Sequence, residues 1–336
     1  MNTRDIMGAW KRVLTGSVPI MSIEITRECP LHCPGCYAYG DTHLAGGATL
    51  RQLSDLRGDQ LVQGIVGLVK RHRPLHVSLV GGEPLVRHRE LSQLLPILSD
   101  MGVWSMVVTS AVIPIPVEWN SIPHTVIAVS VDGLPEHHDV RRHPATYEKI
   151  LKNIEGRRVN IHLTITAPML ERPGYLDEYF AFWSARPEVE WIWISTYTPQ
   201  VGEKTPEMLS AAQRAEVAAL MLQWRARYPR LLMDARTPQA IANPPRSPRD
   251  CAFAALSVNY SADLKTRVEP CIFGGTPDCS QCGCAVSVAL HGIQHVKFGK
   301  VVSVGQLVKA STAVGAAVNW LRPDLDRPSR WTKPAA

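Results

Sequence analysis

Apolar and polar positions alternate in blocks along residues 20–196 of the chain. Six apolar, strand-like runs are separated by segments in which apolar residues recur at helical spacing. Parallel strands need crossover connections, which helices usually supply, so this order predicts an α/β fold, specifically a partial (β/α)6 TIM-like barrel. The predicted strands are 21–26, 75–80, 103–109, 125–131, 159–166 and 190–196, and the predicted helices between them are 49–71, 88–100, 145–155 and 173–185.

The rest of the chain has a different pattern. One strong helix is predicted at 206–228, and a proline-rich loop at 243–248 precedes a cysteine-rich segment. Residues 303–322 place their apolar side chains on one helical stripe, and Ile6, Met7, Trp10 and Val13 do the same on a shorter scale. We therefore expect an N-terminal helix (1–17), the barrel (18–200), a helical connector (201–250), a small cysteine-rich domain (251–290) and a C-terminal amphipathic helix and tail (291–336).

Composition places few limits on function. The 336 residues are 45% hydrophobic and 20% charged, an ordinary soluble mix, and no 18 apolar residues run together. The net charge of +6 is too small to indicate a nucleic-acid-binding surface. The first residues also lack the pattern of a secretory signal peptide. We expect a cytoplasmic protein that neither spans a membrane nor binds nucleic acid.

All eight cysteines fall into two groups, which is typical of metal sites in a reducing compartment rather than of a disulfide framework. Cys29, Cys33 and Cys36 follow the first strand with the spacing CxxxCxxC. Three thiolates around one [4Fe–4S] cube leave the fourth iron without a protein ligand, so that it can bind a small molecule. The alternative is a zinc site with His32 as its fourth ligand, although zinc sites favour paired CxxC spacings.

A turn, Gly81-Gly82-Glu83-Pro84, closes the second predicted strand. Together with the three-cysteine loop it resembles the radical S-adenosylmethionine (SAM) superfamily over roughly residues 18–200. In that family the cluster binds SAM at its open iron, and its reduced form cleaves SAM to a 5′-deoxyadenosyl radical. The resemblance implies a partial barrel and an enzyme with [4Fe–4S] and SAM as cofactors.

The same resemblance suggests the residues that line the SAM pocket. Gly81 and Gly82 would allow a tight turn, and Glu83 would accept hydrogen bonds from the SAM ammonium group. Many family members carry an aromatic residue before the third cysteine; this chain has Gly35 there, and Tyr37 is the candidate substitute. The candidate pocket is completed by Ser130 and Asp132 at the end of the fourth strand and by Arg141 or Arg142, one of which would pair with the SAM carboxylate.

Several residues near the candidate SAM pocket are suggested by their position in the sequence alone. Thr109, Ser110 and Thr166 end strands and could point into the cavity, whereas His137 and His138 are expected on the surface. Trp191 and Trp193 share one face of the sixth strand, with Tyr197 following, and they suit either a core or a substrate-lining role.

The second cysteine group resembles the C-terminal auxiliary-cluster regions of many radical SAM enzymes, without the full spacing of the seven-cysteine pattern. It contains one thiol more than a single fully ligated cube needs, so the fifth could be a spare or a substrate-facing proton or hydrogen donor. A zinc knuckle is the alternative. The predicted ligands of a second, auxiliary [4Fe–4S] cluster are Cys251, Cys271, Cys279, Cys282 and Cys284.

The substrate is left open by the sequence. The overall layout is similar to hopanoid-biosynthesis radical SAM proteins, which implies adenosyl addition to an isoprenoid, and equally to peptide-modifying enzymes, which implies hydrogen abstraction from a peptide. We expect a small-molecule, lipid or peptide substrate and an electron donor such as flavodoxin or ferredoxin. The amphipathic ends leave contact with the inner membrane face as an alternative to simple docking on the barrel. The alternative to an enzyme is a non-catalytic protein that binds an iron–sulfur cluster or zinc.

Overall fold

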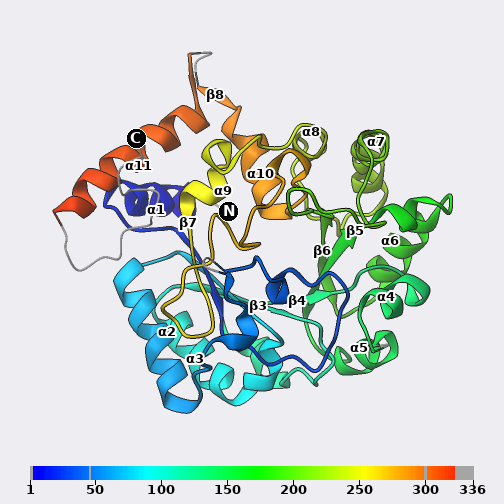
Figure 1. The fold of residues 1–336 in the computed structure, drawn as a ribbon, viewed down its shortest axis with the longest axis horizontal. Helices are drawn as coiled ribbons and strands as arrows, with labels where there is room; N and C mark the ends of the chain where they lie inside the picture. Colours follow the sequence, from blue (N-terminus) through cyan, green and yellow to red (C-terminus); the bar gives the residue numbers. More distant parts are fainter. Residues whose placement is uncertain (1–2, 45–46, 145, 299–300, 322–336) are drawn as a thin grey trace.

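The computed structural model describes residues 3–44, 47–144, 146–298 and 301–321. Its centre is one open, fully parallel sheet of seven strands in the order β6-β5-β4-β3-β2-β1-β7 (Figure 1). This arrangement confirms the predicted α/β partial barrel. The strands are β1 Ile20–Glu24, β2 His76–Val80, β3 Trp104–Thr109, β4 Thr125–Ser130, β5 Val159–Ile165, β6 Val189–Thr196 and β7 Ser257–Tyr260.

Helices connect successive strands and lie outside the sheet (Figure 1). They bury their apolar faces against the outward-facing strand residues, as Ile65 and Leu94 do beside Ile23 and Leu79 in the main core. This packing follows from the pattern of the sequence, in which each strand has an apolar outer face. The connecting helices are α2 Gly58–His72, α3 His88–Asp100, α4 Pro135–Arg141, α5 Tyr147–Asn153 and α6 Tyr175–Ala185.

Two predicted helices are shorter at their N-terminal ends than the sequence suggested. The helix predicted at 49–71 begins only at Gly58, because Leu50–Gln52 form a separate 3-10 turn behind Thr49. The helix predicted at 206–228 is α7, Ala211–Arg227. It begins there because Ser210 and Gln213 form a capping box, in which each side chain bonds the backbone N–H of the other.

The seventh strand, β7, was not predicted. It lies within the cysteine-rich segment and pairs in parallel with β1, from Ile20 opposite Ser257 to Ile23 opposite Tyr260. The cysteine-rich segment is thus joined to the barrel by a shared sheet. After β7 the chain passes through α10 Ala285–Gln294, which packs against β6 at the other edge of the sheet.

The two ends of the described chain lie side by side. Helix α1, Thr3–Leu14, packs against α11, Val304–Trp320, on one flank of the barrel (Figure 1). The predicted helix at 303–322 is therefore present, and it contacts α1, α9 and α10. The remaining elements are α8 Thr237–Ala242, α9 Ala252–Leu256 and the short β8 Lys297–Phe298 and β9 Val302–Ser303. No helix among the described residues combines the length and apolarity that crossing a bilayer requires.

Candidate functional site

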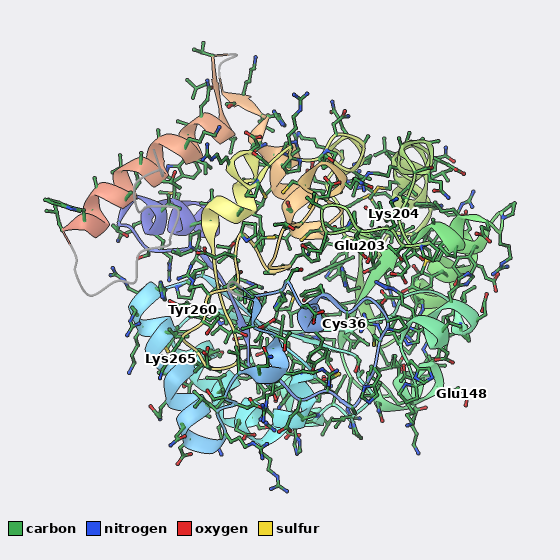
Figure 2. All side chains as sticks on the ribbon, in the orientation of Figure 1. Cys36, Glu148, Glu203, Lys204, Tyr260 and Lys265 are labelled. Atoms are coloured by element: carbon green, nitrogen blue, oxygen red, sulfur yellow. The ribbon has the colours of Figure 1, made fainter. Side chains whose placement is uncertain are left out.

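The first cysteine group lies on a loop at the carboxyl end of β1. In open parallel sheets this edge is where ligands bind, since the loops that follow the strands gather there. Cys29, Cys33 and Cys36 are all free thiols and all half-buried. Cys36 lies near the middle of the molecule in Figure 2, whereas Glu148 lies at its edge.

The Gly81-Gly82 turn holds the start of this loop in place. The Gly82 N–H donates to the Thr26 carbonyl at 2.9 Å, and the Glu83 N–H donates to the Glu28 carbonyl at 2.8 Å. Gly81 has φ +129°, and a Cβ there would lie 2.7 Å from the Thr26 oxygen. A Cβ on Gly82 would collide with the Glu28 carbonyl. Both glycines are required for this close approach of two backbones.

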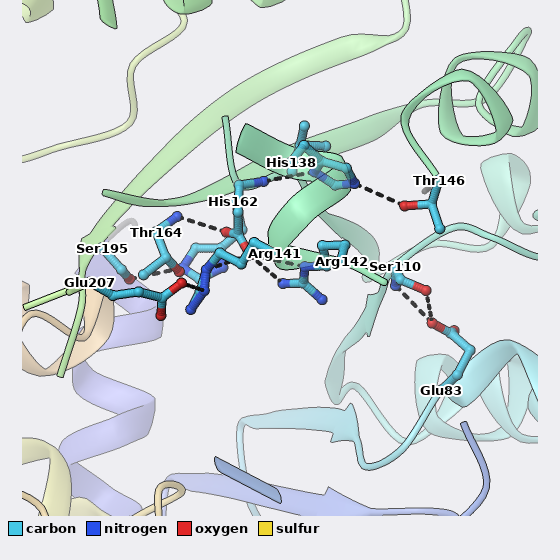
Figure 3. A network of polar contacts seen from close by, with 12 residues as sticks. Glu83, Ser110, His138, Arg141, Arg142, Thr146, His162, Thr164, Ser195 and Glu207 are labelled. Atoms are coloured by element: carbon cyan, nitrogen blue, oxygen red, sulfur yellow. Dashed lines mark hydrogen bonds and ion pairs between the residues drawn. The ribbon is translucent and has the colours of Figure 1, made fainter. Parts of the chain in front are cut away.

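Glu83 is in a different environment from the one that the sequence suggested. Its side chain is 1% exposed and does not line the large cavity described below. The carboxylate accepts from the Thr109 hydroxyl (2.5 Å), the Ser110 N–H (2.8 Å) and hydroxyl (2.5 Å), and the Leu85 N–H (2.9 Å). Figure 3 shows Glu83 and Ser110 apart from the arginine cluster. In this geometry Glu83 braces the turn against β3, and Thr109 and Ser110 face Glu83 rather than the cavity.

A cavity of about 1350 Å³ opens beside the cysteine loop and occupies the barrel interior. Cys33 and Cys36 line it, and Cys29 does not. Among the predicted pocket residues, Tyr37, Ser130, Asp132 and Arg141 also line it, so the structure brings these side chains to one space. Thr166, another candidate, is buried and does not line it.

Asp132 is the centre of the polar wall of this cavity (Figure 3). It is 1% exposed and pairs with Arg142 at 2.8 Å and Arg141 at 3.5 Å, while its other oxygen accepts from the Thr164 N–H at 3.1 Å. Burial alone would raise the Asp132 pKa, but the two guanidinium groups outweigh it and hold the pKa well below its usual range. Asp132 is therefore an anion that positions two cations at the cavity.

The two arginines differ in their further contacts. Arg142 lies near the Cys33 and Cys36 thiols, and although burial opposes its charge, Asp132 and these sulfurs raise its pKa. Arg141 reaches away toward Glu207, at 3.4 Å, and its guanidinium lies 5.7 Å from the Tyr197 ring centroid. Arg142 is thus the cation beside the cysteine loop, and Arg141 is the one that is held by a second carboxylate.

The three thiols of the first group interact with one another. Burial, together with the negative charges of Glu83, Cys33 and Cys36, raises the Cys29 pKa to about 11. Burial likewise raises the Cys33 pKa, and Cys36 adds to the effect while Arg142 opposes it. Thiols clustered in this way become thiolates only beside a strong positive charge, which bound iron provides. The donor set of three sulfurs therefore fits the open-cornered cluster predicted from the spacing.

Among the side chains that the structure describes, no three His, Cys, Asp or Glu converge as ligands of one metal ion.

The second cysteine group surrounds a cavity of its own. All five of its thiols line one small space of about 20 Å³, together with Phe253 and Phe273. Cys284 lines this space and the large cavity as well. The five thiols are free and mostly buried, and burial raises the Cys279 pKa to about 11 and the Cys284 pKa to about 12. The structure thus brings together the five predicted ligands: Cys251, Cys271, Cys279, Cys282 and Cys284.

A buried arginine that the sequence analysis did not single out supports this group. Arg214 of α7 is 6% exposed and donates to the carbonyls of Gln281 and Cys282, both at 2.9 Å, and of Ile241 at 2.7 Å. Burial lowers its pKa, and the nearest charges that oppose this are Cys282 and Asp278. The one feature of the sequence that could have identified Arg214 is a charged residue at a helix position that faces inward.

Gly283 fits this loop against β6. Its carbonyl accepts from the Thr196 N–H at 3.0 Å, and its own N–H donates to the Thr198 hydroxyl at 2.9 Å. A Cβ on Gly283 would collide with Thr196. Only glycine allows this contact without a shift of the backbone.

His43 joins the two cysteine groups, and sequence reasoning did not identify it. The imidazole is 1% exposed, with Nε2 2.7 Å from Glu24 and Nδ1 2.9 Å from the Phe273 carbonyl. Both partners are acceptors, so both ring nitrogens carry protons. Burial opposes this charge, yet the bond to Glu24 raises the His43 pKa. Glu24 also accepts from the Ser261 hydroxyl at 2.5 Å.

The prediction that His138 lies on the surface is wrong. It is fully buried in α4, where its Nδ1 accepts from the Asp132 N–H (3.1 Å) and its Nε2 lies 2.9 Å from the Thr146 hydroxyl. Burial, together with the charge on Arg142, lowers the His138 pKa to about 4, so the ring is neutral. Nothing in the sequence indicated this burial, because Pro135 begins a short helix whose inward face carries His138.

The aromatic candidates are divided between cavity and solvent. Trp193 and Tyr197 line the large cavity, and Trp191 is 42% exposed and lies outside it. Tyr37 packs its ring edge-on against Phe273, 5.3 Å between centroids, and so stands between the cysteine loop and the C-terminal segment.

Comparison with known proteins agrees with this site. A family model described as a 4Fe-4S single cluster domain matches residues 22–144, which include the first cysteine group and the Gly81-Gly82 turn. No curated protein matches the sequence.

Several solved structures share the fold. SuiB of Streptococcus suis bound to its precursor peptide SuiA is 14% identical, with a TM-score of 0.57 over 98% of this chain and 79% of that chain. Native anSMEcpe with bound AdoMet is 14% identical, with a TM-score of 0.54 over 90% of this chain and 97% of that one. In the complex of SuiB with S-adenosylmethionine, the chain spans 60% of SuiB, with a TM-score of 0.50.

The cysteine spacing, the matched cluster segment and the shared partial barrel agree with one another. The chain thus has the fold of SuiB and anSMEcpe, and residues 22–144 match a 4Fe-4S single cluster domain.

Proposed function

We propose that this protein is a radical SAM enzyme whose [4Fe–4S] cluster is held by Cys29, Cys33 and Cys36. The observation that carries the proposal is that Cys33 and Cys36, on the loop that follows β1, line a large cavity whose polar wall is charged. When bound, the cluster and SAM supply a 5′-deoxyadenosyl radical, which abstracts hydrogen from an organic substrate or adds to it.

The chain's own residues would bind and orient SAM. Arg142, which Asp132 fixes beside the cysteine loop, suits the SAM carboxylate, since a guanidinium forks onto carboxylates. Arg141 remains the second candidate, although Glu207 already engages it. Ser130 and Tyr37 line the same space and offer hydroxyls to the ribose or the adenine.

Glu83 has a supporting role in this proposal. Its carboxylate oxygens are engaged by Thr109, Ser110 and Leu85, so it would have to exchange one of these bonds before accepting from the SAM ammonium. We infer that Gly81-Gly82-Glu83 keeps the cysteine loop at a fixed distance from the cavity.

The second cysteine group would hold an auxiliary [4Fe–4S] cluster. Four of its five thiols suffice, and Cys284, which reaches both cavities, is the candidate for the remaining one, either a spare thiol or a residue facing the substrate. A small reducing protein such as flavodoxin or ferredoxin would supply the electron. Contact with the inner face of a membrane, through the exposed Met7 and Val314 on α1 and α11, is a further proposal.

The test is reductive cleavage of SAM. The anaerobically reconstituted protein should form 5′-deoxyadenosine from SAM with dithionite, and Cys33→Ala should abolish it. Cys279→Ala, which alters only the second group, is the matched control and should retain this product. If the wild-type protein binds iron and sulfide but forms no 5′-deoxyadenosine, it is a non-catalytic iron–sulfur protein and the proposal is wrong.

A peptide maturase is the second candidate, because SuiB, which shares the fold, is known in a complex with its precursor peptide. Mass spectrometry separates the two outcomes. Adenosine carbons in the product indicate radical addition, whereas a cross-link or oxidation in a peptide indicates abstraction.

A further inference from the structure

The large cavity extends well past the polar wall near the cysteine loop. Its volume of about 1350 Å³ exceeds the roughly 300–1,000 Å³ of most small-molecule pockets. SAM is itself a ligand of that smaller class, so it would fill only part of the space. The remainder lies along the barrel axis toward the amino ends of the strands, where Pro19, Ile20 and Leu75 line it.

The space exists because the inward strand positions carry small side chains. In a closed TIM barrel, bulky branched residues fill the interior in layers. Here Ser22, Ser78, Ala128, Ser130 and Ser195 line the cavity instead. Substitutions of this kind leave the middle of the barrel hollow, and the open side between β6 and β7 adds to its width.

Helices from both ends of the chain close the far part of the cavity, and their lining is mostly apolar. Trp10 and Val13 come from α1, and α9 and α10 contribute Leu256, Leu290 and Ile293. Helix α11, which packs on α1 in Figure 1, contributes three apolar lining residues, Val304, Leu307 and Val308, and one polar one, Ser311.

This far part offers few hydrogen bonds. The backbone groups of its helices are bonded within the helices, and Asp234 and Arg236, the charged residues that line it, pair with each other at 3.1 Å. Burial lowers the His76 pKa to about 4, so this residue is neutral there. A peptide would bury amide groups without hydrogen-bond partners in this part, which is unfavourable. A hydrocarbon chain loses nothing there and gains from burial.

We propose that the far part of the cavity binds the apolar chain of a lipid-class substrate, with the reacting carbon at the polar end near Cys33 and Cys36. This inference rests on the proposed function, since it names the substrate class of the same site.

The experiment measures binding without turnover. The reconstituted full-length protein is titrated with cis-parinaric acid, a fluorescent fatty acid, and then with geranylgeraniol as a competing isoprenoid. We expect saturable fluorescence and its displacement by geranylgeraniol. Val304→Trp and, separately, Leu307→Trp fill the far part, and each should weaken binding at least about tenfold. Val314→Trp, on the exposed face of the same helix, is the matched control and should bind as the wild type does.

Iron content and the midpoint of thermal unfolding are recorded for every variant, so that a misfolded protein is not counted as a loss of binding. If neither probe binds the wild type, or if both filling variants fold and bind as Val314→Trp does, the inference is overturned. A tryptic digest of casein serves as the peptide probe. If the digest displaces cis-parinaric acid and geranylgeraniol does not, the substrate is a peptide and the inference is likewise overturned.

The two proposals can fail independently. SAM cleavage by the wild-type protein tests the function and needs no lipid, whereas the titration needs neither dithionite nor turnover. A protein that cleaves SAM and binds no apolar probe refutes only the lipid inference.

Discussion

The two cysteine groups differ in how the fold encloses them. The first, Cys29 to Cys36, lies half-exposed on a loop, and two of its thiols face a cavity large enough for several ligands. The second lines a small space together with aromatic side chains; Cys251, Cys282 and Cys284 are buried, and Cys271 and Cys279 are half-buried. A site that must admit SAM and a substrate needs room, whereas a cluster that only passes electrons or stabilises the fold does not. The difference in size supports the proposal that the first group is the reactive one.

Removing one ligand from each group gives the largest expected effect. Cys33→Ala should lose SAM cleavage entirely and lower the iron content from about eight to about four per chain, the count for one cube. Cys279→Ala should lower the iron content equally and keep the cleavage. Iron and sulfide assays beside 5′-deoxyadenosine measurement decide this. Equal loss of cleavage in both variants would remove the distinction between the groups.

Arg214 tests how strongly the second group depends on the fold around it. Arg214→Met leaves the Gln281 and Cys282 carbonyls buried without their donor, which should destabilise the protein by about 2–4 kcal/mol. The iron of the second group should be lost first, and the first group should be spared. Urea unfolding and iron analysis measure both. Arg225→Met, on the exposed face of the same helix, should change neither.

Gly283 tests the contact between the second loop and the sheet. Gly283→Ala places a methyl group against Thr196 and should cost about 1–3 kcal/mol as the loop shifts. Gly67→Ala is the control, because it lies within α2 with open space around it and should be neutral or slightly stabilising. A thermal unfolding midpoint for Gly283→Ala equal to that of the wild type would show that this contact is loose.

The smallest expected effect is on stability and concerns His43, which bonds both Glu24 and the Phe273 carbonyl. The Glu24 carboxylate raises the His43 pKa despite burial, so the folded state binds this proton more tightly than the unfolded state. The stabilisation is therefore complete below the unfolded pKa of about 6.5 and is lost as the pH rises through the raised folded pKa. The difference in unfolding free energy between the wild type and His43→Gln should shrink as the pH rises through that window. A difference that does not vary with pH contradicts a charged His43.

The sequence predicted the parts of this protein that depend on local pattern. The six barrel strands follow from alternating apolar blocks, and the first cysteine group follows from spacing together with the Gly81-Gly82 turn. The missed parts depend on partners distant in sequence. Strand β7 has only four residues, and its partner β1 lies more than 200 residues earlier.

Side-chain directions could not be read from position alone. Glu83 ends a strand at the edge where ligands bind, but the hydroxyls of Thr109 and Ser110 on the next strand engage its carboxylate. Arg214 and His43 carry no motif, because their role is set by carbonyls that the tertiary fold brings to them.

The hydrogen bond from His43 to the Phe273 carbonyl joins residues that are 230 positions apart. A chain still on the ribosome cannot make this contact until its C-terminal third has emerged, although the early βα units can already pair. The brace between the first cysteine loop and the segment around Phe273 therefore forms late in synthesis, after the strands that precede it can already pair.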